Sequence, residues 1–87
     1  MDNKTTENTI NYRTSQDKGK LVRDTMNSVS EALTEKGYNP ANQIVGYLMS
    51  GDPTYITSYK DARSNIKKID RDDLLEEIIN FYLSTAE

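Results

Sequence analysis

Residues 35–53 read EKGYNPANQIVGYLMSGDP and carry two sets of helix stop and start signals. Gly37 can adopt the left-handed conformation that ends a helix. Asn39 then supplies an N-cap, and Pro40 suits the first helical position because it lacks an amide proton. The same stop-and-start signal follows at residues 51–53. The stretch therefore predicts a short helix between two sharp chain reversals.

Within this helix, Ile44, Val45 and Leu48 give an apolar face. Gly46 in its middle costs about 1 kcal/mol relative to alanine. We expect the close approach of another backbone to explain the glycine. A short turn carrying Tyr55 and Ile56 should follow residues 51–53.

Upstream, four apolar residues recur at intervals of four, three and four and make one stripe: Val22, Met26, Val29 and Leu33. This spacing predicts an amphipathic helix over about residues 17–36. Residues 1–16 are rich in threonine and asparagine, with Ile10 and Tyr12 as the large apolar side chains. Such a segment buries too little to offset its ordering entropy, so we expect a disordered tail over 1–16 and a helical domain over 17–87.

Downstream, Ser58 and Asp61 form a capping-box pattern that predicts a helix through Ala62 and Ile66 to Ile69, with a break near Asp70. The final helix carries a wide apolar stripe of Leu74, Leu75, Ile78, Ile79, Tyr82 and Leu83. No alternating run predicts a strand. The fold class is therefore all-α, a small bundle of about four to five helices.

The chain has 87 residues, of which 34% are hydrophobic, and this is little for a stable monomer. Dimerisation would supply further burial, so we expect a helical homodimer. The residues expected in the core or at the dimer seam are Val22, Met26, Val29, Leu33, Ile44, Leu48, Leu75, Ile78, Ile79 and Tyr82.

The chain contains no histidine, cysteine or tryptophan. These absences exclude a disulfide framework, a zinc finger, a Ser-His-Asp triad and a cysteine nucleophile. Neighbouring carboxylates point apart on a helix, and the glycines do not cluster into a phosphate loop. We therefore expect no enzyme activity, metal or cofactor. No signal peptide or membrane span is evident, which favours a soluble cytoplasmic protein without membrane insertion.

Charge is segregated along the chain, whose net charge is -3. Residues 58–71 have a net charge of +3, and residues 72–87 have -5. The basic segment is either a solvated helix face or an anion-binding face, in which Arg63, Lys67 and Arg71 would line one side of a continuous helix. A helix-turn-helix over residues 38–69 would bind DNA, but the acidic balance makes nucleic acid an unlikely partner.

Residues 35–40 (EKGYNP), 42–48 (NQIVGYL) and 50–53 (SGDP) resemble the IreB/ReoM family of small cytosolic regulators of Gram-positive bacteria. The later residues 61–63 (DAR), Ile66, residues 71–72 and the closing apolar helix fit the same family. The resemblance covers about residues 9–83.

The resemblance implies a non-enzymatic phosphoprotein that forms a helical homodimer. A membrane-anchored Ser/Thr kinase with PASTA repeats would phosphorylate its tail, and a phosphatase would reverse this. The unphosphorylated form would favour Clp-protease turnover of the first committed enzyme of peptidoglycan precursor synthesis. Phosphorylation would thus promote wall synthesis and resistance to wall-active antibiotics. The alternative is a DNA-associated or structural helical dimer without a phospho-switch.

In this family a tail threonine is followed three residues later by an aromatic residue. Thr9 and Tyr12 match that pattern, so Thr9 is the expected phosphoacceptor, with Thr5 and Thr6 as weaker candidates. The family's basic positions map onto expected partner-binding residues, which here are Arg63, Lys67, Lys68 and Arg71. Lysine replaces arginine at some of them, which weakens bidentate contacts.

Overall fold

The computed structural model describes residues 2–85, and for residues 2–17 it describes the backbone alone. This part of the chain contains four α-helices, two short 3-10 helices and no strand, so the all-α prediction is confirmed. The helices are α1 (Asp2–Glu35), α2 (Pro40–Ser50), α3 (Ala62–Lys67) and α4 (Arg71–Thr85). The 3-10 helices η1 (Pro53–Tyr55) and η2 (Tyr59–Asp61) lie between α2 and α3.

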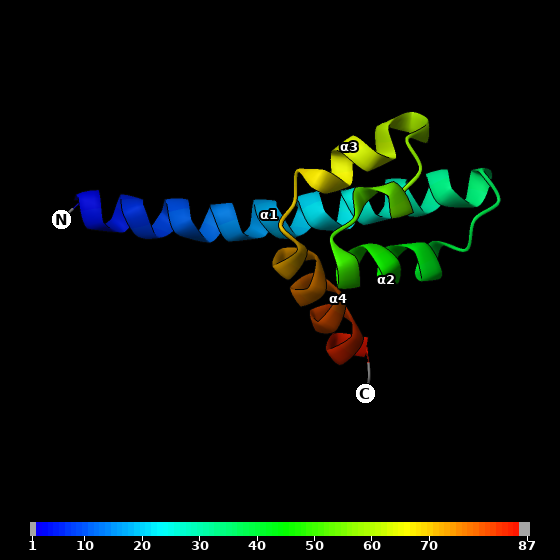
Figure 1. Ribbon diagram of the computed structural model, residues 1–87. Coiled ribbons are helices and arrows are strands. Elements are labelled where there is room, and N and C mark those ends of the chain that lie inside the picture. The colour runs from blue at the N-terminus through cyan, green and yellow to red at the C-terminus, as the bar shows by residue number, and fades with distance from the viewer. Residues whose placement is uncertain (1, 86–87) are drawn as a thin grey trace.

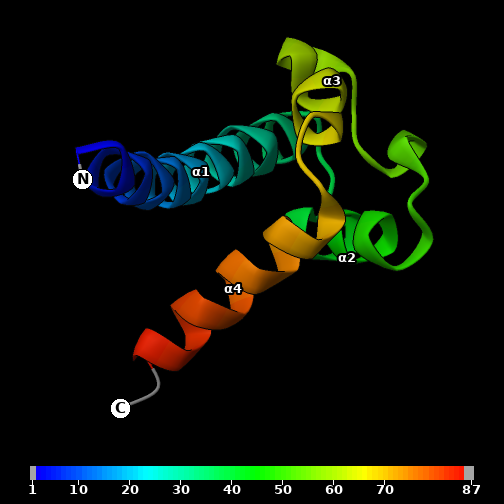
Figure 2. The ribbon, with the colours of Figure 1, turned by 90° about the vertical axis from the view of Figure 1, so that its left-hand side faces the viewer.

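The long helix α1 is the axis of the molecule, as Figure 1 shows. Helices α2 and α3 pack on two sides of its C-terminal half, and α4 crosses near its middle and leads away from the body (Figures 1 and 2). The core lies where α1, α2 and α3 meet and continues to the first turn of α4. Its buried residues are Val22, Val29, Ala32, Leu33, Ile44, Tyr47, Ile56, Ala62, Ile66, Ile69 and Leu74.

The predicted helix boundaries around residues 35–53 are confirmed. Gly37 has a φ of 87°, and the backbone amide of Tyr38 donates to the Leu33 carbonyl at 2.9 Å, which closes the end of α1. The Asn39 side chain accepts from the Asn42 amide at 3.0 Å and caps α2. Gly51 ends α2 with a φ of 77°.

Gly46 departs from its expected role, because its close neighbour is an aromatic ring and not a backbone. A Cβ atom at Gly46 would lie 2.4 Å from Cε1 of Tyr55. The Gln43 side-chain amide also donates to the Tyr55 carbonyl at 2.9 Å, which ties η1 to α2. The glycine therefore makes room for the Tyr55 ring that folds back over α2.

The capping box expected at Ser58 is wrong. Ser58 makes no side-chain cap, and the amide of Tyr59 instead donates to the Thr57 hydroxyl at 3.2 Å. Lys60 and Asp61 then adopt φ values of 54° and 60°, in the left-handed region that residues with a Cβ rarely enter. This kink delays the start of α3 to Ala62 and lets the chain turn back along α1.

The start of α1 also differs from the prediction, because the helical backbone begins at Asp2 and not near residue 17. Extending an existing helix needs no new nucleus, so a segment of low helical preference can continue a packed helix. In Figure 1 this part of α1 projects beyond the other helices of the described chain. The separation of a disordered tail from a helical domain stays a prediction.

Candidate functional site

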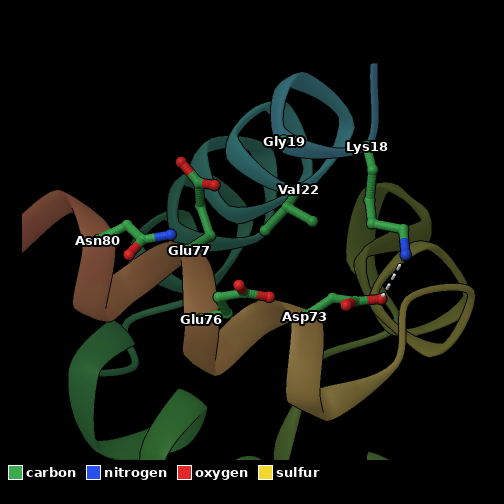
Figure 3. A pocket seen from close by; sticks show the side chains of 7 residues that line it. All are labelled: Lys18, Gly19, Val22, Asp73, Glu76, Glu77 and Asn80. Atoms are coloured by element: carbon green, nitrogen blue, oxygen red, sulfur yellow. Dashed lines mark ion pairs between the residues drawn. The ribbon is translucent and has the colours of Figure 1, made fainter. Parts of the chain in front are cut away.

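Helix α4 meets α1 at a junction with two ion pairs, whose carboxylates lie one turn apart on α4. The Lys18 ammonium lies 3.4 Å from the Asp73 carboxylate, and the Arg23 guanidinium lies 3.0 Å from the Glu77 carboxylate. Figure 3 shows the space between the helices, a cavity of about 320 Å³. Its lining also includes Glu76, Asn80, Val22 and Gly19. The cavity is acidic and open to solvent, and each ion pair is partly exposed and therefore weak.

An apolar groove of about 290 Å³ lies on the other side of the Arg23–Glu77 pair. Its lining includes Met26 of α1 and Ile78 and Phe81 of α4. Beyond it, the outer surface of α4 is apolar and exposed, with Tyr82 65% and Ile79 52% accessible. A helix with a large apolar surface in contact with water is typical of a protein–protein interface.

The residues expected in the core or at a dimer seam fall into three groups. Four of them are buried, and these are Val22, Val29, Leu33 and Ile44. Met26 and Leu48 are partly buried against the core. On α4, Ile78 is half-buried, whereas Leu75, Ile79 and Tyr82 are exposed. The first two groups thus lie in or against the core, and most of the α4 set lies on the open surface.

The basic residues expected to bind a partner do not share one helix face. Helix α3 ends at Lys67 and α4 begins at Arg71, so the continuous helix that would align Arg63, Lys67 and Arg71 is not formed. The break falls near Asp70, where the sequence predicted one. Its physical basis is Ile69, which is buried and turns the chain into the core.

Arg71 has a structural position between two helices. Its Nη1 donates to the Leu48 carbonyl at 3.0 Å, one of the last carbonyls of α2, which lack a helical partner. Its guanidinium also lies against Gly51, where a Cβ would be 2.9 Å from Cζ. Arg71 thereby joins the end of α2 to the start of α4.

Arg63 and Lys67 share a shallow pocket of about 200 Å³ with Ser58, Asp61 and Ser64. The Nε of Arg63 donates to the Ile56 carbonyl at 2.8 Å, which fixes the guanidinium at the rim of this pocket. Lys68 lies elsewhere, in a depression that also includes Lys18 and Leu21. The structure therefore brings two of the four expected basic residues together.

A charged cluster that the sequence analysis missed joins the end of α1 to η2. The Lys60 ammonium donates to the Glu35 carboxylate at 3.1 Å, and Lys36 and Lys60 lie 5.2 and 5.5 Å from the centre of the Tyr59 ring. The hydrogen bonds from Lys60 and then Tyr59 lower the pKa of Glu35, and the same bonds raise the pKa values of Lys60 and Tyr59. The signal that could have found it is the aromatic Tyr59 beside Lys60, a pair suited to cation–π contact.

Thr5, Thr6 and Thr9 lie on the part of α1 for which the structure describes only the backbone. Thr9 precedes Lys18, whose ammonium pairs with Asp73 of α4. No α-helix among residues 2–85 is both long and apolar enough to cross a membrane.

Comparison with known proteins gives one family and close relatives. Residues 7–84 match the model of a family described as the IreB regulatory phosphoprotein. The chain is 56% identical over 75 residues to a UPF0297 protein of Acetivibrio thermocellus, which covers 86% of this chain and 83% of that one. Similar proteins of the same description occur in Lachnoclostridium phytofermentans (54% over 76 residues, 87% and 86% covered) and Ruminiclostridium cellulolyticum (52% over 75 residues, 86% and 85% covered).

Proposed function

Because the chain belongs to the IreB family of regulatory phosphoproteins, we propose that it is a non-enzymatic switch controlled by phosphorylation of Thr9. The observation that carries the proposal is the family match, which spans residues 7–84 and therefore includes Thr9 and Tyr12. A Ser/Thr kinase of the PASTA type transfers the γ-phosphoryl group of ATP to the Thr9 hydroxyl oxygen. The hydroxyl proton and ADP leave, and a phosphatase reverses the change by hydrolysis.

The proposed output is control of peptidoglycan precursor synthesis in the cytoplasm. The unphosphorylated protein promotes Clp-dependent turnover of the first committed enzyme, and phosphorylation relieves this turnover and raises resistance to wall-active antibiotics. A phosphate on Thr9 adds about -1.5 to -2 charge and three strong acceptors, which is a large change for a small acidic protein. The projecting position of this part of α1 supports the proposal, because a kinase cleft needs an accessible segment (Figure 1).

Phosphorylation of the intact protein by the purified kinase domain tests the assignment of Thr9. We expect one phosphate by intact mass, placed on Thr9 by peptide mapping, and loss of labelling in Thr9→Ala. Thr5→Ala and Thr6→Ala are the matched controls, since each removes one hydroxyl from the same segment. Unchanged labelling of Thr9→Ala would exclude Thr9 as the main site.

The output has its own test in cells. Thr9→Ala should lower the level of the first committed enzyme in a Clp-dependent manner, and deletion of the protein should raise it. An enzyme level that responds to neither change would reject this output. Salt-dependent retention of DNA by the purified protein would instead favour a DNA-associated dimer.

The protein acts as a homodimer in this proposal, with α4 as the seam. The exposed residues Leu75, Ile79 and Tyr82 follow at spacings of four and three, so they share one face of α4. A second copy presents the same face, and two-fold pairing of identical apolar stripes covers both at once. Their burial adds to the small core of a chain of this size.

Light scattering coupled to size exclusion tests the seam. We expect the mass of a dimer for the wild-type chain and of a monomer for the Ile79→Glu variant. Val45→Glu is a matched control on α2, because Val45 is 56% exposed and Ile79 is 52% exposed. A monomeric wild-type chain, or dissociation by both variants alike, would contradict α4 as the seam.

A further inference from the structure

The pocket of Ser58, Asp61, Arg63, Ser64 and Lys67 is a compact polar site that the fold itself does not use fully. The ion pairs formed within residues 18–85 involve Lys18, Lys20, Arg23 and Lys60, and none of them involves Arg63 or Lys67. Arg63 lines the pocket and uses its Nε for the Ile56 carbonyl, so that bond does not engage the two terminal nitrogens of the guanidinium. The Ser64 hydroxyl already donates to the Asp61 carbonyl at 3.1 Å. A fixed guanidinium beside a lysine and the Ser58 hydroxyl suits a phosphate monoester.

We infer that this pocket binds the phosphate of Thr9 of the same chain, so that phosphorylation folds the N-terminal segment back along α3. This inference rests on the proposed function for the origin of the phosphate. Beyond that function, the phosphate has a docking site on the same chain, and docking changes the conformation of the N-terminal segment. In the phosphorylated form the N-terminal segment covers the basic surface that is open in the unphosphorylated form.

The lengths of the segments permit this docking. Helix α3 runs antiparallel to α1, because Lys60 pairs with Glu35 before α3 begins and Lys68 lies beside Lys18 and Leu21 after it ends. The pocket therefore lies alongside α1 between residues 18 and 35, a distance of about 26 Å along a helix. An extended chain from Thr9 to Lys18 spans at most about 30 Å, which is enough to reach every part of α3.

Docking requires the first part of α1 to leave the helix. As a helix, the segment places Thr9 about 14 Å beyond Lys18, on the far side from α3. In Figure 1 the backbone of this part of α1 projects beyond the other helices of the described chain. A helix without tertiary contacts is marginal in water, and a few charge-assisted hydrogen bonds are enough to compete with it.

One group in the pocket carries a negative charge, so removing it should have the opposite effect to removing a lysine. The Asp61 carboxylate lies in the same lining as Arg63 and Lys67. It repels a phosphate and weakens docking. Asp61→Asn should therefore strengthen docking, whereas Lys67→Gln should weaken it.

Paramagnetic relaxation in the full-length protein tests docking directly. Phosphothreonine is incorporated genetically at position 9, so the result does not depend on which residue a kinase chooses. The chain has no cysteine, so Asn11→Cys provides a single spin-label site. We expect the amides of Ser64 and Lys67 to broaden in the phosphorylated protein and to stay sharp in the unphosphorylated one.

Variants identify the pocket as the cause of the broadening. Lys67→Gln should lower the ratio of docked to free protein about fivefold, and Asp61→Asn should raise it. Lys20→Gln is the matched control, since it removes the same charge from the exposed surface of α1 and should leave the ratio unchanged. An equal effect of Lys20→Gln and Lys67→Gln would show a general electrostatic attraction between the phosphate and the protein. It would overturn the proposal that the pocket binds the phosphate.

Two further outcomes would also overturn the inference. One is identical spectra of the phosphorylated and unphosphorylated proteins. The other is phosphorylation-dependent broadening of the Ser64 and Lys67 amides of isotope-labelled chains by spin-labelled unlabelled chains in a mixed sample, because this would place the phosphate on a second copy. If the docking is found but the kinase does not modify Thr9, the pocket stands and the proposed function fails.

Discussion

At the scale of single residues, Gly46 and Tyr55 form a matched pair. An alanine normally improves a helix interior, but at Gly46 its methyl group would overlap the Tyr55 ring. We expect Gly46→Ala to lower the free energy of unfolding by about 1–3 kcal/mol, measured by urea denaturation. In a Tyr55→Ala background the same change should stabilise α2 by up to about 1 kcal/mol. Equal effects in both backgrounds would show that the Tyr55 ring is not the reason for a glycine at position 46.

Asp61 is a second residue whose backbone conformation determines which residue type is most stable at that position. Its φ of 60° disfavours a side chain, and it makes no capping hydrogen bond through that side chain. Asp61→Gly should therefore raise the free energy of unfolding by about 0.5–1 kcal/mol. Ser64→Gly, within α3, should lower it by about 1 kcal/mol. A loss of stability in Asp61→Gly would mean that the carboxylate supports the fold.

At the scale of the elements, Arg71 connects α2 to α4. Arg71→Ala leaves the Leu48 carbonyl without its donor, and we expect a loss of about 1 kcal/mol in unfolding free energy. Lys68→Ala removes a nearby positive charge that lies in a different depression and should change stability by less than about 0.5 kcal/mol. Hydrogen exchange at the last turn of α2 should also quicken in Arg71→Ala alone. Unchanged exchange there would refute the connection.

The contact between α1 and η2 should make stability depend on acid pH. The hydrogen bond from Lys60 holds the pKa of Glu35 below its usual 4.5. A carboxyl group with a lowered pKa stabilises the fold above its unfolded pKa, and this stabilisation is lost as the pH falls through the folded pKa. Glu35→Gln should therefore show a shallower fall in unfolding free energy between about pH 5 and pH 3. Parallel curves of unfolding free energy against pH for the wild type and Glu35→Gln would exclude a contribution of Glu35 to the acid sensitivity.

The elements also show what the sequence predicts well and what it does not. The ends of α1 and α2 follow from Gly37, Asn39 and Gly51, because these residues act on their own neighbours. The partners of Arg71 and Glu35 depend on contacts across the fold, so spacing along the chain could not supply them. For the same reason the spacing aligned Arg63, Lys67 and Arg71, whereas the structure brings only Arg63 and Lys67 into one pocket.

At the scale of the whole molecule, the local stability of α1 should fall toward its N-terminus. Residues 22–33 contribute four of the buried core residues, whereas the backbone of residues 2–16 lies beyond the other helices (Figure 1). We expect amides of residues 2–16 to exchange within the shortest labelling times and those of residues 22–33 to be protected to nearly the global unfolding free energy. Uniform protection along α1 would contradict a marginal N-terminal segment.

The two exposed surfaces lie on different parts of the molecule. Helix α4 carries exposed apolar residues, and Arg63 and Lys67 of the pocket belong to α3. Figure 2 shows α4 leading away from α3. Pairing through α4 therefore leaves the pocket open to the N-terminal segment of its own chain. Dimerisation and phosphate docking should thus be independent, and Ile79→Glu should leave the response to phosphothreonine intact.

The length of α1 has a consequence for measurement. The molecule extends 54 Å along its longest axis, and a helix of 34 residues is about 51 Å long. One helix alone therefore determines the longest dimension of a single chain. Any event that bends or unwinds its first turns shortens the protein, so scattering or diffusion can report the state of the N-terminal segment without a label.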